Sequence, residues 1–484
     1  MLFNSWGYIL LFLIAGTSIH WMLPHRYRIY LLSIGGILFY CMWRWEFVLL
    51  MIFSPTLDYI CALKVYKAKS LREKKFWLIS TLSINIGLLV FFKYTYFIYG
   101  SAQYLGNIGG LHLPNIFINI ILPLGISFYT FHSISYTIDV YRRIITPINS
   151  YTTFLTYVTF WPQLMAGPIL RPKEVLPQLE DVRLFNSNRF AAGIERIIFG
   201  LFKKVVIADN LATMVDTAYS LDPHLLTSYD VWVAAFMFGF QIYFDFAGYS
   251  DIAIGSAKLL GVDFPENFDW PYLATSPKVF WKKWHISLSA WIRDYLYLPL
   301  TGQKFKTQSL GGIGEAAEKS QGHNVTIALF LTWFIMGLWH GAAWTFAIWG
   351  IIHASLIFVY RRFSFFDWLE KKAAVVSWLL VLIFSMLAWI PFRANSINQT
   401  FVMYCKLIQP VDYIFNMHKL TSKYYYTVVL LLSGMILLHL IKLLIVKHRE
   451  HVLFQTIKYI TIALLVVLIT TFLENKNQFI YFQF

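Results

Sequence analysis

The feature that most restricts how this chain can fold is a series of long apolar blocks, several of which lack any Lys, Arg, Asp or Glu over their central turns. Each block is close to or longer than the roughly 20 residues that a helix needs to cross the hydrocarbon of a bilayer. A core helix of a water-soluble protein would alternate an apolar and a polar face, and these blocks do not. We therefore expect an all-α protein that crosses a lipid bilayer many times. The clearest blocks are residues 4–23, 76–98, 117–138, 324–360, 373–392, 424–446 and 454–473.

The composition agrees with a membrane protein and disfavours several other classes. Only 13% of the residues are charged, whereas soluble domains contain roughly 25%. The formal charge of +15 implies no nucleic-acid partner, because Lys and Arg gather in short loops between the apolar blocks, where they set orientation and contact anionic lipid. Cys41, Cys61 and Cys405 lie far apart without a C-x-x-C motif, so we expect neither a disulfide framework nor a metal site.

The basic loops predict an orientation in the membrane. The densest one, from Lys64 to Lys75, is expected in the cytoplasm. Counting back through three spans places His25–Arg28 inside and the N-terminus outside. Counting forward places residues 100–115 outside, and this loop has no Lys or Arg. The first block has no basic region before it and no small-residue cleavage site, so we expect a retained span rather than a secretory signal.

The middle third of the chain, from Gly167 to Gln303, has shorter apolar segments interrupted by proline-containing and polar motifs. Non-helical backbone at membrane depth persists only where it is buried in protein or lines a wet cavity. We therefore expect re-entrant segments and a pocket in this region. Residues 302–324 are the best candidate for an exposed loop. No repeat of fixed period is visible, so we treat residues 1–484 as one membrane domain.

His340 is the first candidate for chemistry. It is the only titratable residue in the apolar segment 324–350, and an ionisable group at that depth is costly to place. Gly337 precedes it by three residues and has no side chain, so a substrate could approach the imidazole there. Gly341 follows directly and could end or kink the helix. The alternative is a core histidine bonded to a neighbouring carbonyl.

His285 is the second candidate. A helical wheel of residues 278–298 places tryptophan, leucine and tyrosine side chains on one face and charged side chains opposite, which predicts an amphipathic helix at the membrane interface. His285 lies at the margin of the aromatic face, and Ser289 follows one turn later. An anchor helix with an incidental histidine is an equally good interpretation of this pattern.

The sequence disfavours other kinds of active site, and this leaves proton transfer by histidine as the expected chemistry. Asp245 and Asp251 are the most apolar-embedded carboxylates, and we expect them to form structural ion pairs. There is no G-x-S-x-G elbow for a serine hydrolase, and the histidines are too scattered for a di-iron site. A neutral imidazole could instead take the proton from a hydroxyl that attacks a bound thioester.

The segments that carry these residues resemble the membrane-bound O-acyltransferase family, in particular its bacterial alginate O-acetylation branch. The resemblance covers the middle and the end of the chain, and the combination of motifs is highly specific. The matching stretches are WPQLMAGPILRPKEVLPQL (161–179), FDFAGYSDIAIGSAKLLGVDFPENFDWPY (244–272), FWKKWHISLSAWIRDYLYLPL (280–300), FIMGLWHGAAWTFAIWG (334–350) and FIYFQF (479–484).

This resemblance implies a fold and a set of site residues. The fold would have roughly 11 or more transmembrane helices, with re-entrant and interfacial amphipathic helices, around a funnel or tunnel. His340 in GLWHG would be the catalytic residue and His285 in WHISLS a second one lining the same tunnel. Neither position departs from the family pattern. The accompanying candidates for tunnel lining and support are Trp284, Ser289, Gly337, Trp339, Asp251 and Tyr249.

The resemblance also implies a reaction. An acyl group, here acetyl, would pass from a cytoplasmic thioester donor to hydroxyls of a cell-surface exopolysaccharide or of peptidoglycan. Acetyl-CoA would be the donor substrate, with no bound cofactor, although we find no CoA-binding motif. A periplasmic partner acetyltransferase and a location in the bacterial cytoplasmic (inner) membrane belong to the same expectation.

Two alternatives stay open at this point. One is D-alanyl transfer from an acyl carrier protein to teichoic acid, in which the carrier would dock on basic loops such as Lys64–Lys75. The other is a lipid or polysaccharide transporter without covalent chemistry. Transporters often contain two halves with matching broken helices, and we find no such duplication in the sequence.

Overall fold

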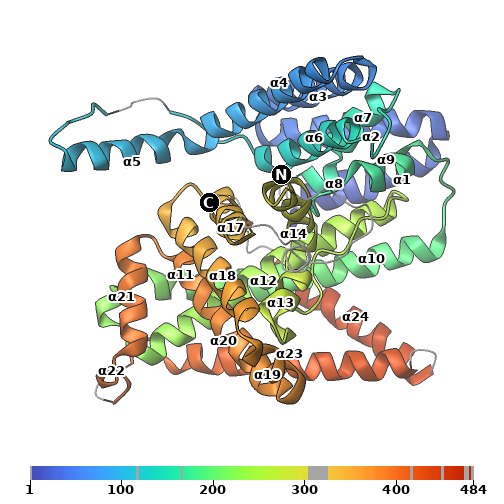
Figure 1. The fold of residues 1–484 in the computed structure, drawn as a ribbon. Helices are drawn as coiled ribbons and strands as arrows, with labels where there is room; N and C mark the ends of the chain where they lie inside the picture. Colours follow the sequence, from blue (N-terminus) through green and yellow to red (C-terminus); the bar gives the residue numbers. More distant parts are fainter. Residues whose placement is uncertain are drawn as a thin grey trace.

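The fold is described from a computed structural model of the chain. It describes residues 3–115, 119–164, 167–302, 325–414, 418–448, 452–473 and 479–480. These residues form helices, turns and irregular segments, and none of them is in a β-strand (Figure 1). Except for Gly302, the expected exposed loop 302–324 lies outside the described residues.

The N-terminal helices form one side of the protein, the blue to teal part of Figure 1. One π-helical stretch directly precedes α1, and another directly follows α4. The elements are η1 (Tyr8–Gly16), α1 (Thr17–Met22), α2 (His25–Arg44), η2 (Trp45–Phe47), α3 (Val48–Lys67), α4 (Leu71–Leu89), η3 (Val90–Tyr94), α5 (Thr95–Ile108), α6 (Ile126–Tyr141), α7 (Tyr151–Thr159), α8 (Trp161–Leu164) and α9 (Pro172–Glu180).

The central part is built around α12, which has 32 residues. In its most apolar stretch, 78% of the residues are buried inside the protein. A series of short helices follows it, as expected for the interrupted middle third. The elements are α10 (Ser187–Leu201), η4 (Phe202–Ala208), α11 (Asp209–Ser220), η5 (Pro223–Leu225), α12 (Ser228–Leu259), η6 (Pro271–Leu273), α13 (Pro277–Lys283), α14 (Ile286–Ile292), η7 (Arg293–Tyr297) and α15 (Leu298–Leu300).

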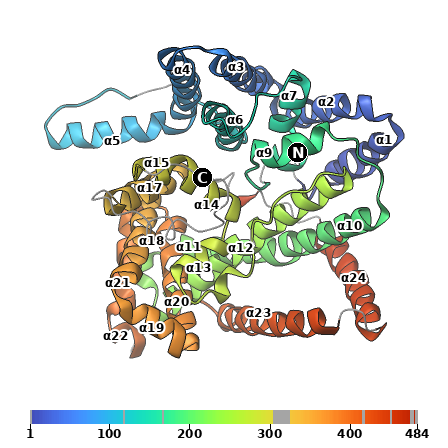
Figure 2. The ribbon, with the colours of Figure 1, turned by 45° about the vertical axis from the view of Figure 1, so that its right-hand side comes forward.

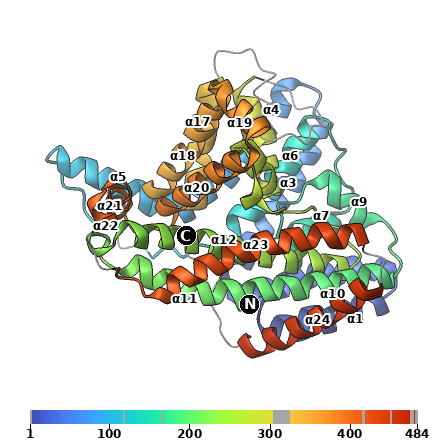
Figure 3. The same ribbon diagram turned by 90° about the horizontal axis from the view of Figure 1, so that it is seen from below.

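The C-terminal helices cover the other side. The last two, α23 and α24, pack along α12 and α10 at the edge of the protein (Figures 2 and 3). Ile480 contacts α12, where its backbone N–H donates to Asp245. The elements are α17 (Val325–His340), α18 (Trp344–Arg362), α19 (Ser364–Lys372), α20 (Ala374–Arg393), α21 (Ile397–Ile408), α22 (Val411–Ile414), α23 (Ser422–His448) and α24 (Val452–Phe472).

Seven helical stretches within the described residues are long and apolar enough to cross a membrane, and two shorter apolar helices accompany them. Many large apolar side chains on these helices are exposed. In the most apolar stretches of α23 and α24, only 11% of the residues are buried inside the protein. Apolar surface on this scale is tolerated where lipid covers it. The expected all-α, multi-pass membrane fold is confirmed. The longer stretches are His25–Lys67, Leu71–Ile108, Ser228–Leu259, Trp344–Arg362, Ala374–Arg393, Ser422–Leu444 and Gln455–Phe472.

Facing glycines bring α10 and α12 into backbone contact. A Cβ atom added at Gly200 would lie 2.7 Å from the Gly248 carbonyl oxygen, and one added at Gly248 would lie 2.8 Å from the Gly200 oxygen. Helices in lipid gain little from the hydrophobic effect between them, so close packing through small residues contributes much of their association. This contact fixes the position of α12, on which the interior of the protein is built.

A buried ion cluster fixes the chain end to α12. The Lys204 ammonium lies 2.7 Å from Asp209 and 2.6 Å from Asp245, and each of these side chains is at most 3% exposed. The second Asp245 oxygen accepts a hydrogen bond of 2.8 Å from the Ile480 backbone N–H. Buried charges persist only when they are paired and hydrogen-bonded, so this cluster couples η4, α11, α12 and the C-terminal segment.

Lys204→Met should destabilise the protein strongly, because it removes the cation that pairs with two buried carboxylates, a change that typically costs about 3–5 kcal/mol. The neighbouring Lys203→Met is the matched control. Its partner Asp251 keeps a second cation, Arg196, so we expect a loss below about 1 kcal/mol. Thermal unfolding of the detergent-solubilised protein measures both, and equal midpoints for the two variants would contradict the assignment.

Candidate active site

His340 is the last residue of α17, and aromatic rings surround it. Its side chain is buried, with ring centroids of Trp339 and Trp349 at 5.0 Å and of Phe392 at 5.3 Å. These neighbours come from α17, α18 and α20. The helix ends here, and the chain turns through Gly341 into α18, as the sequence predicts. The imidazole is therefore held at a helix end inside an aromatic shell.

Two side chains of η3 bind backbone carbonyls at the C-terminal end of α17. The Lys93 ammonium donates to the carbonyl oxygens of Trp339 (2.6 Å) and His340 (3.1 Å), and the Tyr94 hydroxyl donates to that of Leu338 (2.9 Å). The last carbonyls of a helix have no partner within the helix, and a cation there also interacts favourably with the helix dipole. Lys93 and Tyr94 thus satisfy the backbone that carries His340.

His285 lies at the break between α13 and α14 and has left-handed backbone angles, φ 43° and ψ 56°. This conformation costs an L-residue roughly 1–2 kcal/mol. Backbone hydrogen bonds on both sides hold it, from Asp269 N–H to the Lys283 oxygen and from Ile286 N–H to the Asn267 oxygen, each 3.0 Å. Strain of this kind persists where the surrounding structure fixes it, and it is frequent at functional sites.

Asn267 determines the tautomer of His285. The Asn267 side-chain oxygen accepts from the Ser287 backbone N–H (3.3 Å), and a backbone N–H can only donate, so the oxygen must face that way. The same oxygen lies 3.1 Å from His285 Nδ1, which therefore carries the proton. Nε2 then carries the lone pair. It is buried and has no hydrogen-bond partner among the described residues.

The two histidines lie in one aromatic interior. Trp284, next to His285, lies 4.9 Å from Trp389 on α20, ring to ring, and Trp389 lies 5.3 Å from Phe392, which contacts His340. The chain of ring contacts from Trp284 through Trp389 and Phe392 therefore connects the surroundings of the two imidazoles. An interior of this kind can hold a proton-accepting group away from bulk water. The role of either histidine in catalysis stays a prediction.

The continuous interfacial helix expected over residues 278–298 is wrong. The chain breaks at Trp284–His285, and both Arg293 and Asp294 are buried rather than facing lipid headgroups. Asp294 forms ion pairs with Arg293, at 2.6 Å, and with Arg171. These ion pairs make burial of the charges possible. A helical wheel of residues 278–298 contains no information on a partner as distant in sequence as Arg171.

The open approach expected at Gly337 is also wrong. A Cβ atom there would lie 2.2 Å from the Phe346 carbonyl oxygen, and one at Gly350 would lie 2.2 Å from the Trp333 oxygen. The space beside Gly337 is therefore filled by the backbone of α18. This glycine contributes close packing of α17 on α18 and so supports the position of His340 indirectly.

The remaining candidates have mainly supporting positions. Trp339 stacks on Phe131, with ring centroids 5.2 Å apart, and Ser289 donates from its backbone N–H to the His285 oxygen. Asp251 forms ion pairs with Arg196 (2.6 Å) and Lys203 (2.5 Å), which confirms the structural ion pair expected for it.

Tyr249 belongs to the surroundings of the C-terminal segment. Its buried ring lies 4.3 Å from that of Phe479, which in turn lies 5.6 Å from Phe246. Phe246 contacts the His285 ring edge-on at 4.5 Å. The rings of Phe479 and Phe246 therefore lie between Tyr249 and His285 in this chain of contacts. Phe479 therefore contacts the ring that lies against His285.

Three residues near the histidines were not among the sequence candidates. Asn267 is a buried amide in the PENFDW motif, and Lys93 is the only charged residue of the apolar block 76–98, a signal that could have been used. His353 is buried among tryptophan rings, with Trp281 and Trp349 at 4.9 Å, and neither of its nitrogens has a hydrogen-bond partner among the described residues. No group of three or more metal-ligating side chains occurs in the described part of the chain.

Comparison with known proteins gives consistent matches. A family model described as MBOAT, membrane-bound O-acyltransferase family, matches residues 47–313. A probable alginate O-acetylase of Azotobacter vinelandii is 35% identical over 85% of this chain and 79% of its own length. A peptidoglycan O-acetyltransferase of Helicobacter pylori is 34% identical over 82% and 78%. A teichoic acid D-alanyltransferase of Bacillus subtilis is 28% identical over 52% and 62%.

Lys93→Met should loosen the end of α17, because the carbonyls of Trp339 and His340 lose a charged donor. A hydrogen bond to a charged group contributes about 1.5–3 kcal/mol, so we expect at least a tenfold loss of amide protection around residues 336–342. Hydrogen–deuterium exchange with mass spectrometry measures this. Lys93→Arg, which keeps the donors, is the control, and unchanged exchange in Lys93→Met would contradict the capping role.

Proposed function

The chain belongs to the membrane-bound O-acyltransferase family, and we propose that it transfers acetyl groups to hydroxyls of a cell-envelope polymer with His340 as the catalytic base. The observation that carries this proposal is the pairing of two buried histidines in one aromatic interior, at a helix end and at a strained helix break. Residues from other elements hold the backbone at both positions: Lys93 binds the end of α17, and the Asn267 carbonyl accepts from the Ile286 N–H beside His285.

The reaction follows from the imidazole chemistry. His340 accepts the proton of the acceptor hydroxyl as its oxygen attacks the thioester carbonyl carbon. The new C–O bond forms, the C–S bond breaks, and the same proton passes to the leaving thiolate, so the products are an ester and a thiol. No protein nucleophile is required. His285 presents a lone pair at Nε2 and accepts a hydrogen bond from a neighbouring hydroxyl of the acceptor.

The donor, direction and acceptor form the finer part of the proposal. The donor is a cytoplasmic thioester, acetyl-CoA, and the acetyl group passes to the outer side of a bacterial cytoplasmic membrane. The acceptor is an exopolysaccharide or peptidoglycan, reached with a periplasmic partner acetyltransferase. The relatives named as alginate O-acetylase and peptidoglycan O-acetyltransferase support this choice of polymer class. The basic loop Lys64–Lys75 lies in the cytoplasm and the N-terminus outside.

D-alanyl transfer from a carrier protein to teichoic acid is the second candidate. It is supported by a relative named as teichoic acid D-alanyltransferase, with lower identity and about half of the chain aligned. Higher identity over most of the chain favours acetyl transfer. Membership of an acyltransferase family argues against transport without covalent chemistry.

His340→Ala should abolish acyl transfer while leaving a folded protein in the membrane, because the change removes the base but only one wall of the aromatic shell. Mass spectrometry of polysaccharides and peptidoglycan from cells carrying each variant measures the product, and size-exclusion chromatography checks folding. His285→Ala should be severely impaired. The exposed His224→Ala is the control and should match the parent protein. Full acetylation of the polymer in cells carrying His340→Ala would contradict the catalytic assignment.

Asn267→Leu should reduce the rate by about 10²-fold or more, because His285 loses the acceptor that holds its proton on Nδ1, and a correctly protonated imidazole contributes about 10²–10⁴-fold. Asn267→Asp keeps an oxygen acceptor and should retain more activity. Initial rates of acetyl transfer in isolated membranes, at equal protein levels, compare the two variants. Equal rates for them would show that the hydrogen bond does not determine the tautomer.

A further inference from the structure

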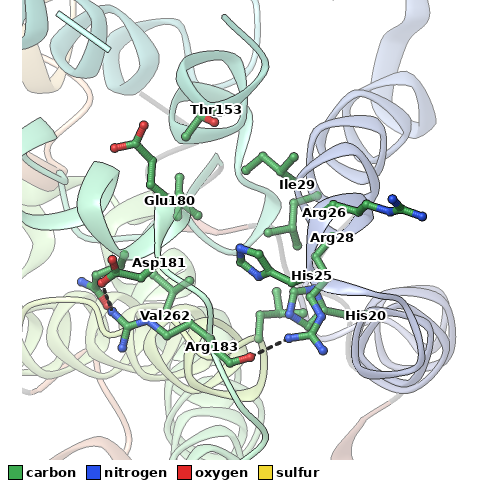
Figure 4. A pocket seen from close by; sticks show the side chains of 14 residues that line it. His20, His25, Arg26, Arg28, Ile29, Thr153, Glu180, Asp181, Arg183 and Val262 are labelled. Carbon is green, nitrogen blue, oxygen red and sulfur yellow. Dashed lines mark hydrogen bonds and ion pairs between the residues drawn. The ribbon is translucent and has the colours of Figure 1, made fainter. Parts of the chain in front are cut away.

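A pocket of ≈ 270 Å³ lies between the end of α1, the start of α2 and the segment after α9. We propose that it is a binding site for a phosphate-bearing anion, separate from the histidine pair. Figure 4 shows His20, His25 and Arg28 on the α2 side of the pocket, with Glu180 and Asp181 on the opposite side. This inference uses none of the residues assigned to acyl transfer, and only its coenzyme A arm rests on the proposed function.

The start of α2 concentrates positive potential in this pocket. The helix N-cap is Pro24, no side chain caps the first turn, and the turn contains no acidic residue. Instead it carries His25, Arg26 and Arg28. A helix N-terminus has a partial positive charge and normally attracts acidic side chains. Basic residues there repel the dipole, and a bound anion would remove that repulsion.

Two of the three arginines that line the pocket, Arg28 and Arg183, have few anionic partners. Arg28 donates to the carbonyl oxygens of Leu23 (3.1 Å) and Arg183 (2.7 Å) and lies over the Trp21 ring, so its contacts with described residues are with neutral groups. Arg183 lies 3.8 Å from Asp181, at the limit of an ion pair, and its Nε is buried without a hydrogen-bond partner among the described residues.

Buried imidazole nitrogens supply the second observation. His20 lines the pocket and is only 3% exposed, yet its Nδ1 has no hydrogen-bond partner in the part of the chain that the structure describes. Nδ1 of the half-buried His25 also has no hydrogen-bond partner among the described residues. Buried polar atoms are nearly always paired. A phosphate group offers oxygen acceptors and, when singly protonated, a hydroxyl donor, so it can satisfy an imidazole in either protonation state.

The carboxylates of the pocket do not neutralise this arrangement. Glu180 and Asp181 are exposed, where solvent screens their charge. Phosphate fits better than carboxylate because its additional oxygens can accept hydrogen bonds from the guanidinium groups and from the imidazoles at the same time. Two sources carry this chemistry: the headgroup of an anionic phospholipid, which belongs at the ends of membrane helices next to a tryptophan such as Trp21, and the phosphates of a soluble nucleotide thioester.

Binding measurements on the purified full chain in detergent separate the sources. Phosphatidylglycerol is compared with diacylglycerol of the same acyl chains, which lacks phosphate, and coenzyme A is titrated separately. We expect Arg28→Gln/Arg183→Gln to weaken phosphate binding by roughly tenfold. Arg72→Gln removes an exposed arginine of α4 outside the pocket and is the control. A loss confined to phosphatidylglycerol assigns a lipid site, and a loss of coenzyme A binding assigns a soluble phosphate.

Parent-like affinity of the double variant for both ligands would overturn the proposal, as would a parent protein that binds neither. Because Arg28 also holds the Arg183 backbone, the double variant could fail to fold. His25→Leu then tests the same pocket, since it replaces a half-buried lining imidazole by an apolar side chain of similar size. It should weaken phosphate binding severalfold, and unchanged affinity would equally overturn the proposal.

Discussion

The structure depends on one constraint: backbone polar groups at membrane depth must find their partners inside the protein. Helix α17 ends in the interior at His340, and its last carbonyls bind Lys93 and Tyr94 instead of water. The break at His285 is matched by Asn267, which uses both its backbone and its side chain. Both candidate residues therefore lie where a helix stops, and both stops exist only because other elements satisfy them.

The same constraint separates inert from reactive groups in the interior. Buried carboxylates such as Asp245 and Asp294 contact lysine or arginine side chains, and breaking such a buried pair is costly, so we interpret these charges as structural. The Nε2 atom of His285 differs, because it is buried and has no hydrogen-bond partner among the described residues. A neutral group with an unpaired lone pair can accept a hydrogen bond from a hydroxyl.

Tight packing places these groups without leaving much freedom. Facing glycines join α17 to α18 and α10 to α12 at backbone distance. The tryptophan rings between His285 and His340 then fill the interior, and hydrogen bonds restrict them further: the Trp389 indole donates to the Tyr272 hydroxyl, which donates to the Gly239 oxygen. An enzyme that keeps a thioester from hydrolysis benefits from such a dry, rigid site.

The sequence by itself determined the membrane location, the broken middle third, His340 as the isolated titratable group and the ion pairing of Asp251. Each of these follows from local composition or from the cost of placing charge in lipid. Tertiary structure decided what local patterns cannot contain. It placed α18 against Gly337, broke the helix at His285, and brought Lys93 to a carbonyl 247 residues away in the sequence. Such contacts depend on which helices meet, and periodicity along one helix carries no information about that.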